Sequence, residues 1–192
     1  GSDRRLSEET TRAISRAREA GLMVCLATGR SYAESIEIWR NLRMTPPFAP
    51  MILIGGALVS EPGSGRTLYQ QSIPRELACE YADALAERNY PAMAIVDVWR
   101  YGWDYVLCET GDVHAVQRDW FDKMNVVVRR TPRLAVLPDL PNPLRINIVA
   151  ERETAFALAA ELGEQFKGRL NIHAMDVPNY EVTIVEAFSV KA

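Results

Sequence analysis

Short apolar runs alternate with amphipathic stretches along the first part of the chain. Residues 22–27 read Leu-Met-Val-Cys-Leu-Ala, and an uninterrupted apolar run of this length predicts a strand buried on both faces. A second apolar run follows at residues 51–54, after a proline-rich segment. Between the two runs, Ser31 and Glu34 have the spacing of a capping box, which predicts a helix over residues 32–43. This order predicts a β-α-β crossover, a connection that is right-handed in nearly all proteins.

Two further elements are expected, one before this crossover in the sequence and one after it. Ser7 is a residue type that favours the N-cap position, and the apolar pattern after it predicts a helix ending near Gly21. Proline and glycine gather at residues 61–65, which predicts the turn of a hairpin whose second strand covers residues 67–71.

From Pro74 onward the pattern becomes a succession of helices and strands. Helical stripes predict three helices, over residues 74–89, 113–123 and 151–166. Apolar runs predict strands at residues 92–98, 105–108, 126–128, 134–137, 144–149, 170–174 and 180–185. A proline-rich connector at residues 138–143 divides this series. The fold class we expect is therefore α/β, with a Rossmann-like start followed by an α+β domain.

Four aromatic residues alternate with other residues within the stretch 99–105. Alternating aromatic side chains are typical of a strand that packs in a sheet, and we expect a hairpin here. If an element of the α+β domain selects a ligand, this aromatic stretch is the first candidate.

Composition and charge argue against several functions. The 192-residue chain has a net charge of −3 with both signs interspersed, which argues against a nucleic-acid partner. The sequence contains no apolar stretch of membrane-spanning length, so no membrane partner is expected. Cys25, Cys79 and Cys108 are widely spaced and form no Cys-x-x-Cys pair, which favours a reducing, cytoplasmic setting over a disulfide framework or a zinc site.

Small and cationic residues follow both apolar runs of the crossover. Thr28, Gly29 and Arg30 come directly after the first run, and Gly55 and Gly56 come after the second. Ligands of open α/β sheets bind where parallel strands end and helices begin, so we expect these residues to bind a phosphate. The alternative readings stay open: the Thr28 hydroxyl caps a local turn, Arg30 is a solvated cation, and the glycines only permit tight turns.

These motifs carry a resemblance to a known family. The order Ala27-Thr-Gly-Arg30, then Gly55-Gly-Ala57, then an α+β insert is similar to the haloacid dehalogenase (HAD) phosphatase superfamily, and within it to the Cof-type subfamily. The resemblance extends from about Asp3 to Lys191. It implies an incomplete three-layer α/β/α Rossmann-like core at residues 1–73, an inserted α+β cap domain at 74–180, and a return to the core at 181–192.

The resemblance also implies a function and roles for single residues. The function is a Mg²⁺-dependent phosphohydrolase that acts on a small phosphorylated metabolite through an aspartyl-phosphate intermediate. Thr28 matches the threonine that hydrogen-bonds the phosphoryl group, and Lys191 is the one candidate for the lysine that balances charge, although a lysine so near the chain end is ordinarily solvated. Gly55-Gly56-Ala57 departs from the usual Asn-Gly-Ala, which removes an amide side chain.

Two motifs of the family have no match in this sequence. They are the Asp-x-Asp-Gly-Thr signature with the nucleophile and the Gly-Asp loop that binds magnesium, so no metal ligand is assigned. We therefore expect the chain to be an internal part of a longer enzyme and to be inactive alone. The strand edge at residues 22–27 is then unpaired, which predicts a homodimer. The alternative function is a non-catalytic module that binds a ligand or partner. A dinucleotide enzyme is disfavoured, because no Gly-x-Gly-x-x-Gly follows either strand.

Overall fold

The computed structural model describes residues 7–124, 126–178 and 180–192, so Asp3, where the resemblance begins, lies outside the described residues. The chain divides into two compact units, Gly1–Gln70 and Gln71–Ala192. The boundary lies close to the expected one after residue 73. Both units mix helices and strands, which confirms the α/β class. No helix among the described residues is both long and apolar enough to cross a membrane.

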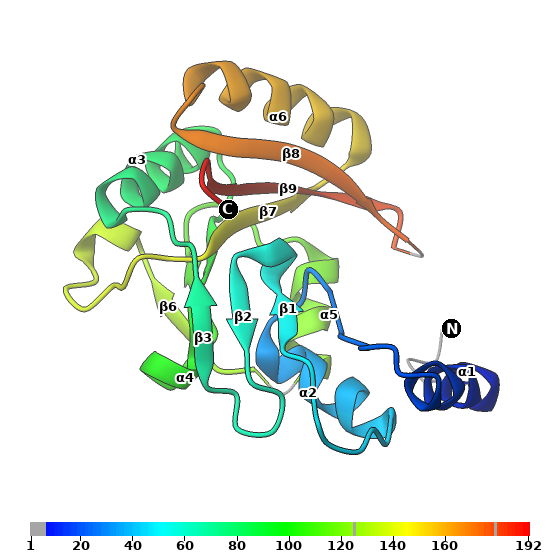
Figure 1. Ribbon diagram of the computed structural model, residues 1–192. Coiled ribbons are helices and arrows are strands. Elements are labelled where there is room, and N and C mark those ends of the chain that lie inside the picture. The colour runs from blue at the N-terminus through cyan, green and yellow to red at the C-terminus, as the bar shows by residue number, and fades with distance from the viewer. Residues whose placement is uncertain (1–6, 125, 179) are drawn as a thin grey trace. The chain divides into compact units, whose positions relative to one another are not determined.

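The described residues of the first unit form two α-helices, a 3-10 helix and a small sheet (Figure 1). Its elements are α1 (Glu8–Glu19), α2 (Tyr32–Asn41), β1 (Met51–Leu53), the 3-10 helix η1 (Ile54–Gly56), β2 (Leu58–Ser60) and β3 (Thr67–Gln70). The three strands pair antiparallel in the order β1-β2-β3, and the turn between β2 and β3 is the predicted one.

Both predicted N-caps are confirmed. Ser7 accepts a hydrogen bond from the Thr10 N–H at the start of α1. At α2 the capping box is complete: the Glu34 N–H donates to the Ser31 hydroxyl (3.4 Å), and the Ser31 N–H donates to the Glu34 carboxylate (2.7 Å). These bonds satisfy donors that have no partner inside a helix, and the helices begin there for that reason.

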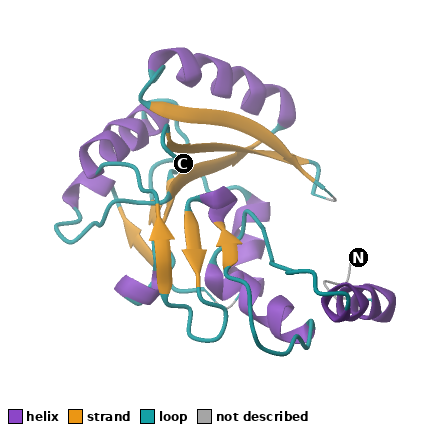
Figure 2. Cartoon of the chain, viewed as in Figure 1, coloured by secondary structure: helices purple, strands orange, loops and turns teal. Residues whose placement is uncertain are grey.

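The predicted buried strand at residues 22–27 is wrong. Figure 2 shows loop between α1 and α2, and the one β-type pairing in it is a parallel bridge from Ala27 to Ile52. Leu22 is 63% exposed and Met23 is 84% exposed. The segment has too few strand residues to pair with. β1 has only three residues, and no other strand in the described part of this unit lies along residues 22–27. The bridge has the parallel direction that the predicted crossover requires.

The second unit is built on a six-stranded sheet. Its elements are α3 (Arg75–Ala86), β4 (Met93–Ile95), α4 (Val98–Tyr101), β5 (Tyr105–Cys108), α5 (Ala115–Lys123), β6 (Val128–Thr131), the 3-10 helix η2 (Leu134–Val136), β7 (Arg145–Ala150), α6 (Arg152–Gln165), β8 (Leu170–Val177) and β9 (Val182–Ser189). The strand order is β6-β5-β4-β7-β9-β8.

Helices α3 and α6 cover one face of this sheet and form its main core. Tyr81 of α3 packs edge-to-face on Phe166, which follows α6, at 5.3 Å between ring centres. Figure 1 shows α6 lying along β8. Helix α5 packs on the opposite face, where Phe121 contacts Tyr105 and Gln117 donates to the Met93 sulfur. The two faces alternate along each strand, as a pleated strand requires.

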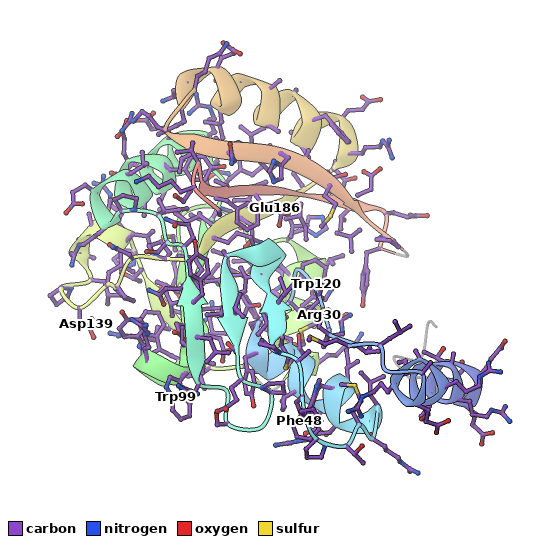
Figure 3. The ribbon with its side chains drawn as sticks, in the orientation of Figure 1. Arg30, Phe48, Trp99, Trp120, Asp139 and Glu186 are labelled. Atoms are coloured by element: carbon purple, nitrogen blue, oxygen red, sulfur yellow. The ribbon has the colours of Figure 1, made fainter. Side chains whose placement is uncertain are left out.

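Two elements of this unit differ in type from the prediction. The aromatic stretch begins as a helix, α4, because Asp97 accepts from the Trp99 N–H as an N-cap and Gly102 ends the turn with φ of 77°. Trp99 is exposed on this helix (Figure 3), so residues 98–101 are not the expected strand. The hairpin itself is confirmed, because β4 and β5 on either side of the helix pair antiparallel. Residues 134–136 form the 3-10 helix η2, where a strand was predicted. This short apolar run has no neighbouring strand to pair with among the described residues.

Strand β9 differs from the expected return to the first domain after residue 180. It lies between β7 and β8 and pairs with both along its length. All eight of its residues are buried. Residues 182–189 therefore belong to the sheet of the second unit, and apolar patterning alone does not reveal to which sheet a strand adds.

Candidate functional site

Two loops of the first unit are joined by backbone hydrogen bonds. The Gly55 N–H donates to the Thr28 carbonyl (3.3 Å), and the Ile54 N–H donates to the Arg30 carbonyl (3.0 Å). Upstream, the Thr28 N–H donates to the Ile52 carbonyl (2.9 Å). We call residues 28–30 and 54–56 the paired loops. Five of the six candidate residues from the sequence lie in them.

The second of the paired loops has a backbone that favours glycine. Gly55 has φ of 62° and Gly56 has φ of 99°, both in the left-handed region where a side chain is unfavourable. Ile54 also has positive φ, 51°, which is strained for a β-branched residue. Strained backbone of this kind is held in place by its surroundings and gathers at binding sites. An added Cβ at Gly56 would meet nothing within 4 Å, so its conformation and not crowding explains the glycine.

The hydroxyl of Thr28 takes part in a local turn. Its oxygen accepts from the Arg30 N–H at 3.3 Å, and the residue is half-buried. This hydrogen bond is the local turn that the sequence analysis gave as the alternative role of Thr28. A hydroxyl that accepts from an amide keeps its own proton to donate, so the turn leaves Thr28 able to bind a phosphate oxygen.

Arg30 is the cation of the paired loops. Arg30, labelled in Figure 3, is half-buried, and none of the ion pairs found among the described residues involves it. A guanidinium presents several donors in a plane and binds phosphate oxygens in pairs. Among the candidate residues of this unit, Arg30 therefore supplies the positive charge that a phosphate would need.

The N-terminus of α2, which follows Arg30 directly, has its own electrostatics. Its positive dipole end favours anions, but the capping box already uses two of its amides and places the Glu34 carboxylate there. The negative charge of that carboxylate repels a phosphate. Nearby, burial raises the pKa of the Tyr32 hydroxyl, which stays protonated and donates to the Pro62 carbonyl (2.8 Å). Sequence reasoning identified Glu34 as a cap and missed this electrostatic consequence.

The sixth candidate, Lys191, lies in the other unit. It follows β9, is exposed, and its N–H donates to the Ser189 hydroxyl (3.3 Å). The structure groups the five residues of the paired loops with one another and does not group Lys191 with them. Its assigned role stays a prediction.

The described residues do not fit a magnesium site. Mg²⁺ binds through carboxylate oxygens, and no group of three or more His, Cys, Asp or Glu side chains in the described ranges is placed to hold a metal ion. Glu34, the carboxylate nearest in sequence to the paired loops, is occupied by the capping box.

A polar cluster on the sheet of the second unit escaped sequence analysis. Arg145 and Asn147 lie on β7 within a run that reads as an apolar strand, and Glu186 lies on β9. All three are buried. Arg145 and Asn147 alternate with Ile146 and Ile148, which indicates that the two polar residues share one face of the strand. No pattern in the nearby sequence indicates that β7 and β9 are neighbours.

Comparison with known proteins identifies relatives of this chain. A family model described as haloacid dehalogenase-like hydrolase matches residues 1–192. No curated protein sequence matches the chain. A haloacid dehalogenase-like hydrolase from Bacteroides thetaiotaomicron is similar in structure, with a TM-score of 0.74 and 18% identity, covering 99% of this chain and 66% of that one.

Two further solved structures share the fold. A HAD/COF-like hydrolase from Plasmodium vivax has a TM-score of 0.72 and 20% identity, covering 98% of this chain and 63% of that one. A sugar phosphatase of HAD subclass IIB has a TM-score of 0.67 and 18% identity, covering 96% of this chain and 63% of that one. The chain thus spans 63% to 66% of the length of these three proteins.

Proposed function

The chain belongs to the haloacid dehalogenase-like hydrolases, and on that premise we propose that its first unit holds the phosphoryl group of a small phosphorylated metabolite for hydrolysis. The observation that carries the proposal is the pair of hydrogen bonds that joins residues 28–30 to residues 54–56. They bring a hydroxyl, a guanidinium and a glycine turn into one place. A sugar phosphatase among the similar structures supports a phosphorylated substrate of metabolite size.

Each residue of the paired loops has a physical role in this proposal. The Thr28 hydroxyl donates its proton to a phosphate oxygen, and Arg30 offsets the negative charge. Gly29 is exposed and has no side chain, so a phosphate can approach its backbone closely. Gly55 and Gly56 hold the opposite loop in the left-handed conformation that the hydrogen bonds to Thr28 and Arg30 require.

Lys191 and magnesium complete the proposed chemistry only by resemblance to the family. A lysine would neutralise the phosphoryl group and the nucleophile, and Mg²⁺ would offset charge on the oxygens. Turnover through an aspartyl-phosphate also needs an aspartate nucleophile beside the phosphate. Because the described residues do not provide a metal site, we expect the 192-residue chain to bind phosphate without hydrolysing phosphate esters.

The test measures binding of inorganic phosphate to the 192-residue chain by calorimetry. Thr28→Val and Arg30→Gln should each weaken binding about tenfold, because each removes a hydrogen bond to a charged oxygen. Arg12→Gln is the matched control: Arg12 is an exposed arginine of α1 and should leave affinity unchanged. Equal affinity in wild type and both loop variants would contradict the phosphate site.

The same preparations distinguish this function from a non-catalytic binding module. A module for an unphosphorylated ligand has no need to bind phosphate, so a wild-type chain without phosphate affinity favours that alternative. Release of phosphate from p-nitrophenyl phosphate, measured with Mg²⁺ and again after chelation, tests the expected inactivity. Metal-dependent release would show that this expectation is wrong and that the chain carries its own nucleophile.

A further inference from the structure

Helix α5 of the second unit (Figure 1) begins with a histidine cap. His114 is the N-cap residue, and the Val116 N–H donates to its Nδ1 at 3.2 Å. A ring nitrogen that accepts a hydrogen bond has no proton, so the neutral ring carries its proton on Nε2. The usual N-cap residues are Ser, Thr, Asp and Asn, and none of them changes charge near neutral pH. This cap differs from them, because it exists only while the imidazole is neutral.

The charged groups around the ring come from three segments. Nε2 lies 3.6 Å from a carboxylate oxygen of Glu151, the N-cap residue of α6. His114 and Glu151 line a pocket of about 260 Å³ together with Asp112 and Tyr90. On α5 itself, Arg118 lies one turn after the cap, where its N–H donates to the His114 carbonyl. The two carboxylates favour a protonated ring, and the positive charge of Arg118 disfavours it.

Protonation of the ring destabilises the start of α5. A protonated imidazole has two donors and no acceptor, so the Val116 N–H loses its partner. The new positive charge also lies at the positive end of the helix dipole. Attraction to Glu151 opposes these two effects, but its side chain is 76% exposed, and water screens such a pair. Loss of an N-cap hydrogen bond is the larger effect, because exposed ion pairs contribute little.

The cap is coupled to the packing of α5 on the sheet. Val116 and Trp120 pack against a small core formed by Val149, Val182 and Ile184. Val116 is the residue whose N–H is capped, so loss of the cap frees the first turn that holds its side chain on this core. Imidazoles change charge between about pH 5 and pH 8. We propose that His114 is a pH-sensitive switch whose protonation opens the first turn of α5 and loosens Val116 from the sheet.

Hydrogen exchange measured by NMR on the 192-residue chain tests the proposal. The measured quantity is the protection factor of the Val116 amide, which is the ratio of its intrinsic to its observed exchange rate. Between about pH 7.5 and about pH 5.5 it falls about fivefold in the wild type, because His114 gains its proton over this range. His114→Asn keeps a capping side chain that does not titrate, so its protection factor stays constant.

The second of the two histidines in the chain supplies a matched control. His173 lies on β8, where its ring stacks on Phe188 at 5.6 Å between ring centres. His173→Asn keeps the wild-type fall in protection of Val116. A constant protection factor in the wild type, the same fall in His114→Asn, or loss of the fall in His173→Asn would overturn the proposal.

The tautomer of His114 gives a readout that needs no substitution. Nitrogen NMR of the wild-type side chains at about pH 8 shows His114 with its proton on Nε2, as a cap through Nδ1 requires. A proton on Nδ1 at this pH would overturn the proposal even if His114→Asn does not fold, because that tautomer cannot accept from the Val116 N–H.

Discussion

The carboxylate of Glu34 has two opposing effects at the residue scale. It accepts from the Ser31 N–H at 2.7 Å and so stabilises the start of α2. It also places a negative charge at the helix end next to Arg30, where we propose that phosphate binds. A cap contributes roughly 0.5–2 kcal/mol to helix stability, and a charge at a helix terminus contributes roughly 0.3–1 kcal/mol. The two effects are similar in size, so both are measurable.

The substitution Glu34→Gln separates the effect of Glu34 on helix stability from its effect on phosphate affinity. Glutamine keeps the capping geometry, because its side-chain oxygen accepts from the same N–H, but it removes the charge. We expect phosphate affinity to rise about twofold to fivefold while Tm changes little. Calorimetry and thermal melts of the same samples measure both. Glu37→Gln, an exposed carboxylate further along α2, is the control. An affinity that stays constant or falls would show that Glu34 does not face the phosphate.

At the scale of elements, residues 22–27 behave unlike the other predicted strand of the crossover. β1 forms because β2 supplies hydrogen bonds along it, whereas the segment 22–27 meets β1 only at its end. Its apolar side chains, Leu22 and Met23 above all, are exposed. Strand-like apolar edges with unpaired backbone tend to associate with other chains. We propose that two copies of this chain associate through this edge.

Met23→Lys tests that association. A lysine on an edge opposes pairing, because joining the edges would bury its charge. Sedimentation velocity over a range of concentrations should show dimers for the wild type and monomers for the variant. Met175→Lys changes an exposed methionine on β8, the edge strand of the other sheet, and should leave the dimer intact. A monomeric wild type, or dissociation by Met175→Lys alone, would contradict the proposed edge.

At the scale of the whole molecule, the core beneath α3 and α6 contains a titratable thiol. Burial raises the pKa of Cys108 to about 12. The ordinary pKa of a cysteine thiol is 9.0, so in the unfolded chain this thiol loses its proton at a lower pH than in the folded protein. The unfolded state then binds fewer protons than the folded state, and the free energy of unfolding falls with pH above about 9.

This linkage predicts a difference between the wild type and Cys108→Ala. Between about pH 8 and about pH 10, the wild type should lose about 1 kcal/mol more of its unfolding free energy than the variant, which has no thiol to titrate at this position. Urea unfolding at several pH values measures both curves. The remaining groups are common to both proteins, so their contributions cancel. Parallel curves would show that Cys108 does not titrate differently on folding.

Much of the candidate site was predictable because its signals are local. The capping box of Ser31 and Glu34 lies within four consecutive residues, and the glycines at 55 and 56 mark the positive φ values found there. The contact between the paired loops followed from the parallel direction of the crossover, which places two carboxyl ends together. The predicted strand in the aromatic stretch 99–105 was wrong at its start, because Asp97 caps a short helix there. Alternating aromatic residues are only a weak signal for a strand.

By itself, the sequence determined where α1 and α2 begin, where the chain turns between β2 and β3, and which loops meet at the first crossover. These features depend on residues a few positions apart or on the direction of one connection. The tertiary structure decided which apolar runs became strands and which sheet β9 joined, because a strand exists only when a partner completes its hydrogen bonds. It also decided that Asn147 and Glu186, far apart in the chain, face each other. Such pairings depend on how β7 and β9 pack as a whole, and no local pattern encodes them.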